Sequence, residues 1–156
     1  MKYNRRKFIK KTALTTTGIG AFTILPSTVW ANNNAPSDKV NVAIIGCRAK
    51  GFAILKFFLD NSEVNCTAMC DVDRKLLEGK AQEIIIKYNQ KPKLYADFRK
   101  MLERKDIDAV IIGTPDHWHC LNMVYALQAG KDVYVEKPLG NSIEECNIMV
   151  RAARRY

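Results

Sequence analysis

The sequence predicts an α/β fold in which helices cover both faces of a parallel, doubly wound sheet. After residue 40, five short apolar segments alternate with five longer segments of helical periodicity. The first apolar segment runs directly into the glycine-containing hexapeptide GCRAKG at 46–51. A repeated strand–helix order favours parallel strands, because each crossover returns the chain to the same end of the sheet.

The predicted strands are rich in β-branched residues and are bounded by polar residues or glycine. The fourth strand is the most apolar, which favours an interior position in the sheet. No strand is predicted after the last helix, although a complete doubly wound sheet usually has a sixth. The five strands span residues 40–46, 64–71, 93–96, 108–114 and 132–136.

The predicted helices are marked by one apolar face and by residues that cap their ends. Over 50–60, apolar residues recur at positions 52, 55 and 59, as a helix buried on one side requires. The fourth helix begins near Pro115 and ends at Gly130, a residue type that suits the first position after a helix. The other caps are Asp73, Asp97 and the capping box of Ser142 and Glu145.

The first 31 residues predict an export signal rather than a folded element. Six basic residues and no acidic one lie in this segment, its middle is modestly apolar, and Ala31 is small enough for cleavage. The pair Arg5 and Arg6 resembles the twin-arginine signal, with Asn4 where Ser or Thr is commoner. We therefore expect export to the periplasm by the twin-arginine machinery. The alternative is a basic amphipathic anchor that stays uncleaved on the membrane.

The rest of the chain is close to charge balance. Of the 25 basic residues, 19 follow the signal segment, together with all 16 acidic residues, which argues against a nucleic-acid partner. The five cysteines have no C-x-x-C spacing and there are only two histidines, so we expect no metal site. Residues 32–38 are polar and predict a linker, and residues 39–156 predict a single domain.

The hexapeptide is close to the G-x-G-x-x-G fingerprint of a dinucleotide-binding loop. Gly46 and Gly51 occupy the outer glycine positions, whereas Arg48 replaces the middle glycine. A side chain there hinders close backbone approach to a pyrophosphate, but its guanidinium can pair with a phosphate oxygen. Asp71 ends the second strand, where an acidic residue binds a ribose diol and repels a 2′-phosphate. This favours NAD over NADP, while Arg74 keeps NADP possible, and the alternative for Asp71 is a turn or cap residue.

The segment GTPDHWH, at 113–119, follows the fourth strand. Its H-x-H spacing points His117 and His119 to different faces of a helix, which makes them a poor metal pair. We expect His119 to face the cleft and Asp116 to cap the helix. Trp118 is interpreted as a packing residue.

The segment EKPLG, at 136–140, follows the fifth strand. The proline after Lys137 restricts the backbone, so that the ammonium group can be aimed. Beside a nicotinamide ring, this lysine can polarise a substrate hydroxyl or accept its proton. The alternative is an ordinary surface lysine.

Taken together, VAIIGCRAKG, AMCDVD, VIIGTPDHWH and ALQAGKDVYVEKPLG resemble the Gfo/Idh/MocA oxidoreductases, from about Val40 to the end of the chain. The resemblance implies an NAD(P)-binding, Rossmann-like domain followed by a larger α/β substrate domain. Typical members transfer a hydride to or from a carbon of a sugar or cyclitol. It implies Lys137 as the catalytic residue present here, with the main catalytic histidine in the second domain. The implied cofactor-binding residues are Gly46, Arg48, Gly51, Asp71, Arg74, Thr114, Pro115, Asp116, His119, Glu136, Lys137 and Pro138.

Three functions remain open at this stage. The first is the cofactor-binding domain of an exported sugar oxidoreductase, truncated before its substrate domain and therefore not catalytically competent by itself. The second is an NAD-dependent glycosidase of the same family, which cleaves a glycosidic bond through transient oxidation. The third is a truncated, non-catalytic nucleotide-binding module. A homo-oligomer is possible for the full-length protein.

Overall fold

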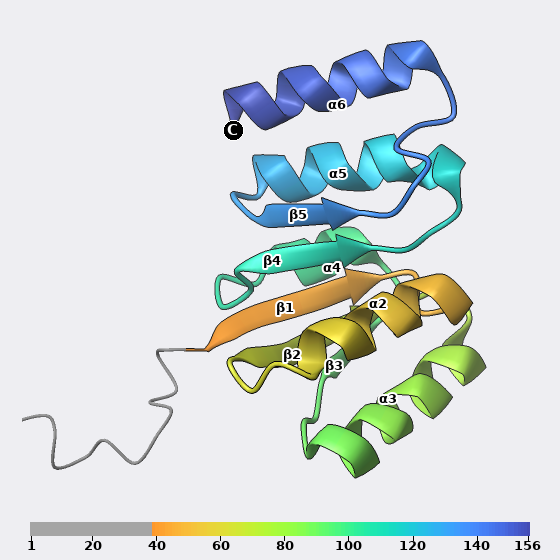
Figure 1. Ribbon diagram of the computed structural model, residues 1–156, viewed down its shortest axis with the longest axis vertical. Coiled ribbons are helices and arrows are strands. Elements are labelled where there is room, and N and C mark those ends of the chain that lie inside the picture. Colours follow the sequence, from red (N-terminus) through yellow and green to blue (C-terminus); the bar gives the residue numbers. More distant parts are fainter. Residues whose placement is uncertain (1–38) are drawn as a thin grey trace, which may run out of the picture. The chain divides into compact units, whose positions relative to one another are not determined.

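The parallel five-stranded sheet that the sequence predicts forms the centre of the fold, and its strands lie in the order β3-β2-β1-β4-β5 (Figure 1). The computed structural model describes residues 39–156, so the predicted export signal and linker lie outside the described residues and stay predictions. The strand order reverses between β1 and β4, which is where ligands bind in sheets of this class. The strands are β1 (Val40–Ile45), β2 (Val64–Cys70), β3 (Lys93–Tyr95), β4 (Ala109–Ile112) and β5 (Asp132–Val135).

Two helices cover each face of the sheet. The helices α2 and α3 pack on one face, α4 and α5 pack on the other, and α6 lies outside α5 (Figure 1). Within residues 39–156 none of these helices combines the length and the apolar character of a membrane span. They are α2 (Ala49–Leu59), α3 (Arg74–Tyr88), α4 (Phe98–Leu102), α5 (His119–Gln128) and α6 (Ile143–Arg155), with a 3₁₀ turn η3 (Asp116–Trp118) before α5.

The middle strand β1 is apolar from Val42 to Ile45 because both of its faces are buried there. Val42 and Ile44 pack in the core beneath α2 and α3, whereas Ala43 and Ile45 pack in the core beneath α4 and α5. All four side chains are at most 4 % exposed. The continuous apolar run therefore reflects burial on two sides rather than a half-exposed strand.

A bulge in β2 decides on which side of the sheet the residues after it emerge. Val42 pairs with Cys66 and Ala43 pairs with Ala68, so Thr67 has no partner in β1. Cys66 and Met69 consequently pack in the same core although they are three residues apart. Because side chains alternate along a strand, a strand without the bulge would exchange the two faces beyond this point, including that of Asp71.

Most of the predicted helix caps are confirmed. The Asp73 carboxylate accepts a hydrogen bond from the Leu76 N–H, the Asp97 carboxylate accepts one from the Arg99 N–H, and Gly130 has a φ of 71°. The Ser142 hydroxyl accepts a bond from the Glu145 N–H, as the capping box requires.

Two details of the caps differ from the prediction. The Glu145 carboxylate binds the N–H of Asn141, whereas a capping box would place it on Ser142. Asp116 does not cap α5, because the chain first forms η3. The Asp116 carboxylate instead accepts a hydrogen bond from the adjacent N–H of His117. The α-helix itself begins after Trp118, which makes no side-chain capping bond. The 3₁₀ turn was not foreseen because its signals are those of an ordinary helix start.

Candidate functional site

The predicted site residues meet at one edge of the sheet, where the carboxyl ends of the parallel strands lie. The sheet hydrogen bonds continue into the loops that follow. The Gly46 N–H bonds to the Cys70 carbonyl at 2.9 Å, and the Gly113 N–H bonds to the Ile45 carbonyl at 2.9 Å. The loops after β1, β2 and β4 therefore start side by side, although they lie far apart in the sequence.

Three glycines let the start of α2 press against the end of β4. Gly46 has a φ of +87°, a conformation that L side chains rarely adopt. A Cβ atom on Gly51 would lie 2.2 Å from the Gly46 carbonyl oxygen, and one on Gly113 would lie 2.3 Å from the Gly51 Cα. The fingerprint glycines thus serve close packing with a third glycine that follows β4.

Arg48, the residue that replaces the middle glycine, has ordinary backbone geometry. Its φ of −79° and ψ of 167° are extended angles that any residue adopts, so the substitution causes no backbone strain. The side chain is 73 % exposed, and its Nη2 lies 3.1 Å from Oδ2 of Asp73. The guanidinium therefore lies at the surface beside the loop.

The N-terminus of α2 is suited to an anion. No side chain caps it, and its first turn contains no acidic residue. Arg48 and Lys50 place positive charge there instead, although the helix dipole favours negative charge at that end. The first backbone N–H groups of a helix have no partner within the helix, so they can bind phosphate oxygens.

Asp71 serves both the turn after β2 and the loop after β1. Its Oδ1 accepts a hydrogen bond of 2.9 Å from the Asp73 N–H, and its Oδ2 accepts one of 2.7 Å from the Cys47 N–H. The turn role considered from the sequence is therefore present. A carboxylate oxygen has a second lone pair, so both oxygens can still accept bonds from ribose hydroxyls.

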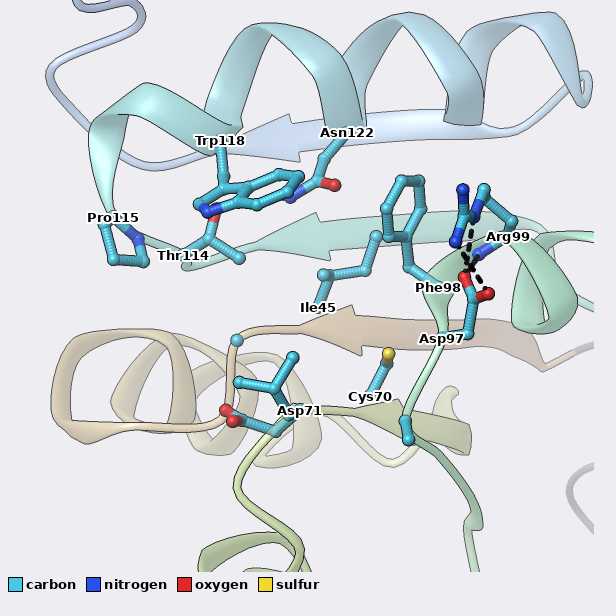
Figure 2. Close-up of a pocket in the computed structure, with 13 residues that line it drawn as sticks. Ile45, Cys70, Asp71, Asp97, Phe98, Arg99, Thr114, Pro115, Trp118 and Asn122 are labelled. Carbon is cyan, nitrogen blue, oxygen red and sulfur yellow. Dashed lines mark hydrogen bonds and ion pairs between the residues drawn. The ribbon is translucent and has the colours of Figure 1, made fainter.

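A cavity of about 490 Å³ adjoins Gly46 and Asp71. Figure 2 shows Trp118 and Asn122 on one side of it and Cys70 and Asp71 on the other. Four of the predicted cofactor-binding residues line the cavity: Gly46, Asp71, Thr114 and Pro115. Its other lining residues are Ile45, Cys70, Val72, Ala96, Asp97, Phe98, Arg99, Trp118 and Asn122.

Sequence reasoning missed much of this cavity. Trp118, interpreted as a packing residue, is 44 % exposed and forms part of its wall. Phe98 and Asn122 carry no motif, since their position at the cavity depends on how α4 and α5 pack. The segment 96–99 had a usable signal, because it directly follows a parallel strand at the same edge as Asp71.

The wall formed by the start of α4 is held by an ion pair and an aromatic contact. Asp97 binds Arg99 through two bonds of 2.9 Å, and these bonds hold the pKa of the Asp97 carboxyl below its usual value. The Phe98 ring packs edge-on against Tyr125 of α5, with ring centroids 5.7 Å apart. The charges of Asp97 and Arg99 therefore compensate each other at the cavity wall.

The Arg74 side chain is exposed and lies near Asp71. It lines a smaller pocket of about 290 Å³ that also includes Asp71, and its Nε bonds to Glu78 at 2.8 Å. This hydrogen bond raises the pKa of the Arg74 guanidinium. The geometry places a cation near the Asp71 carboxylate but outside the larger cavity.

His119 joins the loops that follow β4 and β5. It is only 1 % exposed, its Nδ1 lies 2.7 Å from the Pro138 carbonyl oxygen, and its Nε2 lies 2.8 Å from the Thr114 carbonyl oxygen. A neutral imidazole donates one of these bonds and an imidazolium donates both. His119 does not line the larger cavity, whereas His117 is exposed beside Asp116.

Lys137 follows β5 and is exposed, next to a cis peptide bond to Pro138. It forms no ion pair with any residue in the described part of the chain. Glu136, Lys137 and Pro138 do not line the larger cavity, and Arg48, Gly51 and Asp116 also lie outside its lining. The predicted cofactor contacts of these residues stay predictions.

Cys47 and Cys66 are buried in the core beneath α2 and α3, and Cys70 is buried in the other core and lines the larger cavity. Burial raises the pKa of Cys66 and Cys70 to about 12, and burial together with the Asp71 charge raises that of Cys47 further. These thiols therefore stay protonated at neutral pH and are unsuited to nucleophilic chemistry. Among residues 39–156, no three His, Cys, Asp or Glu side chains are grouped to hold a metal ion.

A doubly wound parallel sheet, a glycine loop before an uncapped helix and an acidic residue after the second strand together define a dinucleotide-binding Rossmann domain. The comparison with known families supports the same class. The chain belongs to the Gfo/Idh/MocA oxidoreductase family with an NAD-binding Rossmann fold, whose model matches residues 40–156.

The curated relatives include glycosyl hydrolase family 109 proteins. The chain is 31 % identical to a "Glycosyl hydrolase family 109 protein" of Shewanella pealeana, over 99 % of this chain and 38 % of that protein. It therefore spans about 38 % of the length of that curated relative.

Two solved structures share the fold. Myo-inositol dehydrogenase from Lactobacillus casei, in complex with NAD(H) and myo-inositol, matches with a TM-score of 0.69 and 25 % identity, over 76 % of this chain and 34 % of that chain. The 3-ketoreductase KijD10 from Actinomadura kijaniata, in complex with NADP and TDP-benzene, matches with a TM-score of 0.63 and 25 % identity. The match covers 74 % of this chain and 34 % of that chain. The prediction of an NAD cofactor, with NADP possible, is confirmed at the level of the family.

Proposed function

We propose that this chain is the cofactor-binding part of an oxidoreductase that transfers a hydride to or from a carbon of a sugar or cyclitol, with NAD preferred. One observation carries the proposal: the cavity joins the glycine loop to the Asp71 carboxylate at the reversal of strand order. A dinucleotide needs an anion site beside a diol site, and the uncapped N-terminus of α2 and the Asp71 carboxylate support these two roles. The two solved structures, a myo-inositol dehydrogenase and a 3-ketoreductase, support the substrate class.

The residues present fit such a cofactor. The N-terminus of α2 would hold the pyrophosphate, with the Arg48 guanidinium beside it. Asp71 would accept bonds from the ribose hydroxyls and would repel a 2′-phosphate. Since the cavity includes Asp71 but not Glu136 or Lys137, it fits the adenosine half, and the nicotinamide half would lie toward the ends of β4 and β5.

Lys137 is the catalytic candidate on this chain. When bound, the nicotinamide supplies the hydride acceptor or donor. The ammonium group of Lys137 would polarise the reacting oxygen of the substrate or hold its proton, since the side chain is exposed at the edge where the nicotinamide half would lie. His119 would position this loop through the Pro138 carbonyl, while lying outside the larger cavity itself.

Calorimetry of the purified chain tests the cofactor proposal. We expect NAD to bind, ADP-ribose to keep most of the affinity, and NADP to bind at least about tenfold more weakly because of Asp71. ADP-ribose serves as the control that isolates the half of the ligand assigned to the cavity. Absence of any heat or of saturable binding with all three ligands would refute the proposal.

An NAD-dependent glycosidase is the second candidate, favoured by the glycosyl hydrolase family 109 relative that aligns with 99 % of this chain. A chimera in which residues 40–156 replace the matching segment of the Shewanella pealeana protein can be incubated with aryl glycosides. Release of the aglycone that requires NAD but accumulates no NADH supports this candidate. NADH binding to the chimera, measured by the fluorescence of NADH, is the control that the cofactor domain is folded.

We also propose export by the twin-arginine route, on the support of Arg5, Arg6 and the basic start of the chain. The test is cell fractionation of the protein and of a variant with Arg5→Lys and Arg6→Lys. The unaltered protein should be found in the periplasm or on the membrane, and the variant in the cytoplasm. A variant with Lys10→Arg and Lys11→Arg, which preserves the total charge, is the control and should behave as the unaltered protein.

A further inference from the structure

We infer that Asn122 recognises the exocyclic amino group of the adenine base, and so makes the cavity selective for adenine over a 6-oxopurine. The inference rests on the proposed dinucleotide function, in which Asn122 would be the residue that contacts the base. Asn122 lies near the start of α5 and forms part of the wall of the 490 Å³ cavity. No motif in the sequence singles it out.

The Asn122 side chain is buried with one end unpaired. The residue is 1 % exposed, and its Nδ2 lies 3.3 Å from the Thr114 hydroxyl. Its Oδ1 exposes less than 1 Å² and has no hydrogen-bond partner, and it is the one such buried side-chain atom among residues 39–156. Figure 2 shows the carboxamide beside the Trp118 indole, with its oxygen turned to the side of Phe98.

A buried acceptor without a donor destabilises the fold, so an apolar side chain would serve packing better at this position. The cost is offset if a ligand supplies the missing donor. Thr114 anchors the other end of the carboxamide, and the free oxygen is turned to the side of Phe98, another residue of the cavity wall (Figure 2). If the amide were rotated by 180°, the free end would be the Nδ2 donor, and the chain would bind the 6-oxo analogue more tightly than NAD. That result in the test below would overturn the inference.

The surroundings select the kind of donor. Ile45, Val72 and Phe98 line the cavity with apolar surface, and the Trp118 indole offers a flat face for stacking. The charged groups of Asp97 and Arg99 bind each other. A neutral, planar base with an N–H donor at its edge fits these walls, and it would be attached to the ribose that Asp71 would bind.

Adenine is the base of the proposed cofactor that carries such a donor. Its 6-amino group donates hydrogen bonds, and asparagine pairs with the same edge of adenine in nucleic-acid recognition. The Asn122 oxygen is closed to water in the structure, so the base reaches it by displacing the neighbouring wall. The wall on that side is Phe98, which is only partly buried, so its ring is the one that must move.

The test compares NAD with nicotinamide hypoxanthine dinucleotide, in which a 6-oxo group replaces the 6-amino group. Calorimetry is done with the full chain and with the variants Asn122→Leu and Asn147→Leu, the latter on the exposed surface of α6. We expect the unaltered chain and Asn147→Leu to bind NAD about tenfold more tightly than the hypoxanthine analogue, as loss of one hydrogen bond predicts. We expect Asn122→Leu to bind the two dinucleotides within a factor of two.

Equal binding of the two dinucleotides by the unaltered chain would overturn the inference, and this comparison needs no variant. A variant Asn122→Leu that weakens both ligands but keeps their ratio would overturn it as well, because the residue would then act through packing alone. If ADP-ribose, NAD and the analogue all fail to bind the unaltered chain, the proposed function fails and the inference falls with it. The first two outcomes leave the dinucleotide function standing.

Discussion

Asp71 and Cys47 are joined by a hydrogen bond of 2.7 Å, in which the Asp71 carboxylate accepts from the backbone N–H of Cys47, 24 residues earlier. Cys47 lies inside the glycine loop, so the acidic residue that would bind ribose also holds the loop that would bind the pyrophosphate. One carboxylate would therefore couple the proposed diol site to the proposed anion site.

Replacement of Asp71 separates these two roles. Asp71→Asn keeps an oxygen for the Cys47 N–H but removes the charge that repels a 2′-phosphate. We expect NAD to bind about 3- to 10-fold more weakly and the preference for NAD over NADP to fall by at least tenfold. Calorimetry with both cofactors measures this, with the exposed Asp60→Asn as the control. An unchanged preference in Asp71→Asn would contradict the role of the charge.

Gly51 and Gly113 should tolerate no side chain. Gly113→Ala would bring a Cβ to 2.3 Å from the Gly51 Cα, so α2 or β4 must shift. We expect a loss of about 1–3 kcal/mol in the free energy of unfolding, measured by urea titration, together with weaker NAD binding. Gly79→Ala is the control: nothing lies within 4 Å of a Cβ there, and alanine in this helix should stabilise by about 0.5–1 kcal/mol. Equal stability of both variants would show that the close packing is unimportant.

Arg48 should bind the cofactor through its side chain. We expect Arg48→Ala to weaken NAD binding about 3- to 10-fold, because the guanidinium can leave the exposed Asp73 and pair with a phosphate oxygen. Arg48→Gly should largely preserve binding, since it lets the backbone approach the pyrophosphate more closely. Calorimetry at low and high salt checks both, with Lys50→Ala as the comparison. Equal or tighter NAD binding by Arg48→Ala would refute the phosphate contact.

The two histidines should differ sharply in their effect on stability. His119→Ala leaves the carbonyl oxygens of Thr114 and Pro138 without their buried partner, and we expect a loss of about 2–4 kcal/mol. The exposed His117→Ala should change the free energy of unfolding by less than about 0.5 kcal/mol. Urea titration of both variants measures the difference. A stability of His119→Ala close to that of His117→Ala would show that the two loops are held by other contacts.

The buried thiols predict a loss of stability in alkaline solution. The pKa of Cys66 is raised from 9.0 to about 12 by burial, so the folded chain keeps this proton over an interval in which the unfolded chain has lost it. The thiol therefore stabilises the fold fully below pH 9, and this contribution falls by up to about 1.4 kcal/mol per pH unit as the pH rises toward 12. Urea titrations from pH 8 to 11 should show a shallower decline for Cys66→Ala than for Cys146→Ala. Parallel declines would contradict the assignment.

The local structure of this domain was largely predictable from the sequence. The apolar runs located all five strands, and Asp73, Asp97 and Gly130 marked helix ends correctly, because each signal depends on residues within one turn or one strand. The predicted start of α5 was wrong, since a 3₁₀ turn and an α-helix share the same N-terminal signals. The bulge at Thr67 could not be foreseen, because it depends on the pairing of β2 with β1.

The candidate site was predictable only in part. Gly46, Asp71, Thr114 and Pro115 belong to recognisable patterns at strand ends and do line the cavity. Phe98, Trp118 and Asn122 line it too, but their contributions come from the packing of α4 and α5 against the sheet. Such packing leaves no periodic trace in the chain.

The sequence by itself determined the order of strands and helices, the position of the glycine loop and the family to which the chain belongs. Only the tertiary structure showed that Arg48 keeps an extended backbone, that Gly113 completes the packing of the glycine loop, and that His119 ties two loops together. The physical reason is the range of the interactions. Propensity and capping act between near neighbours, whereas these contacts join segments whose proximity depends on sheet register and helix packing.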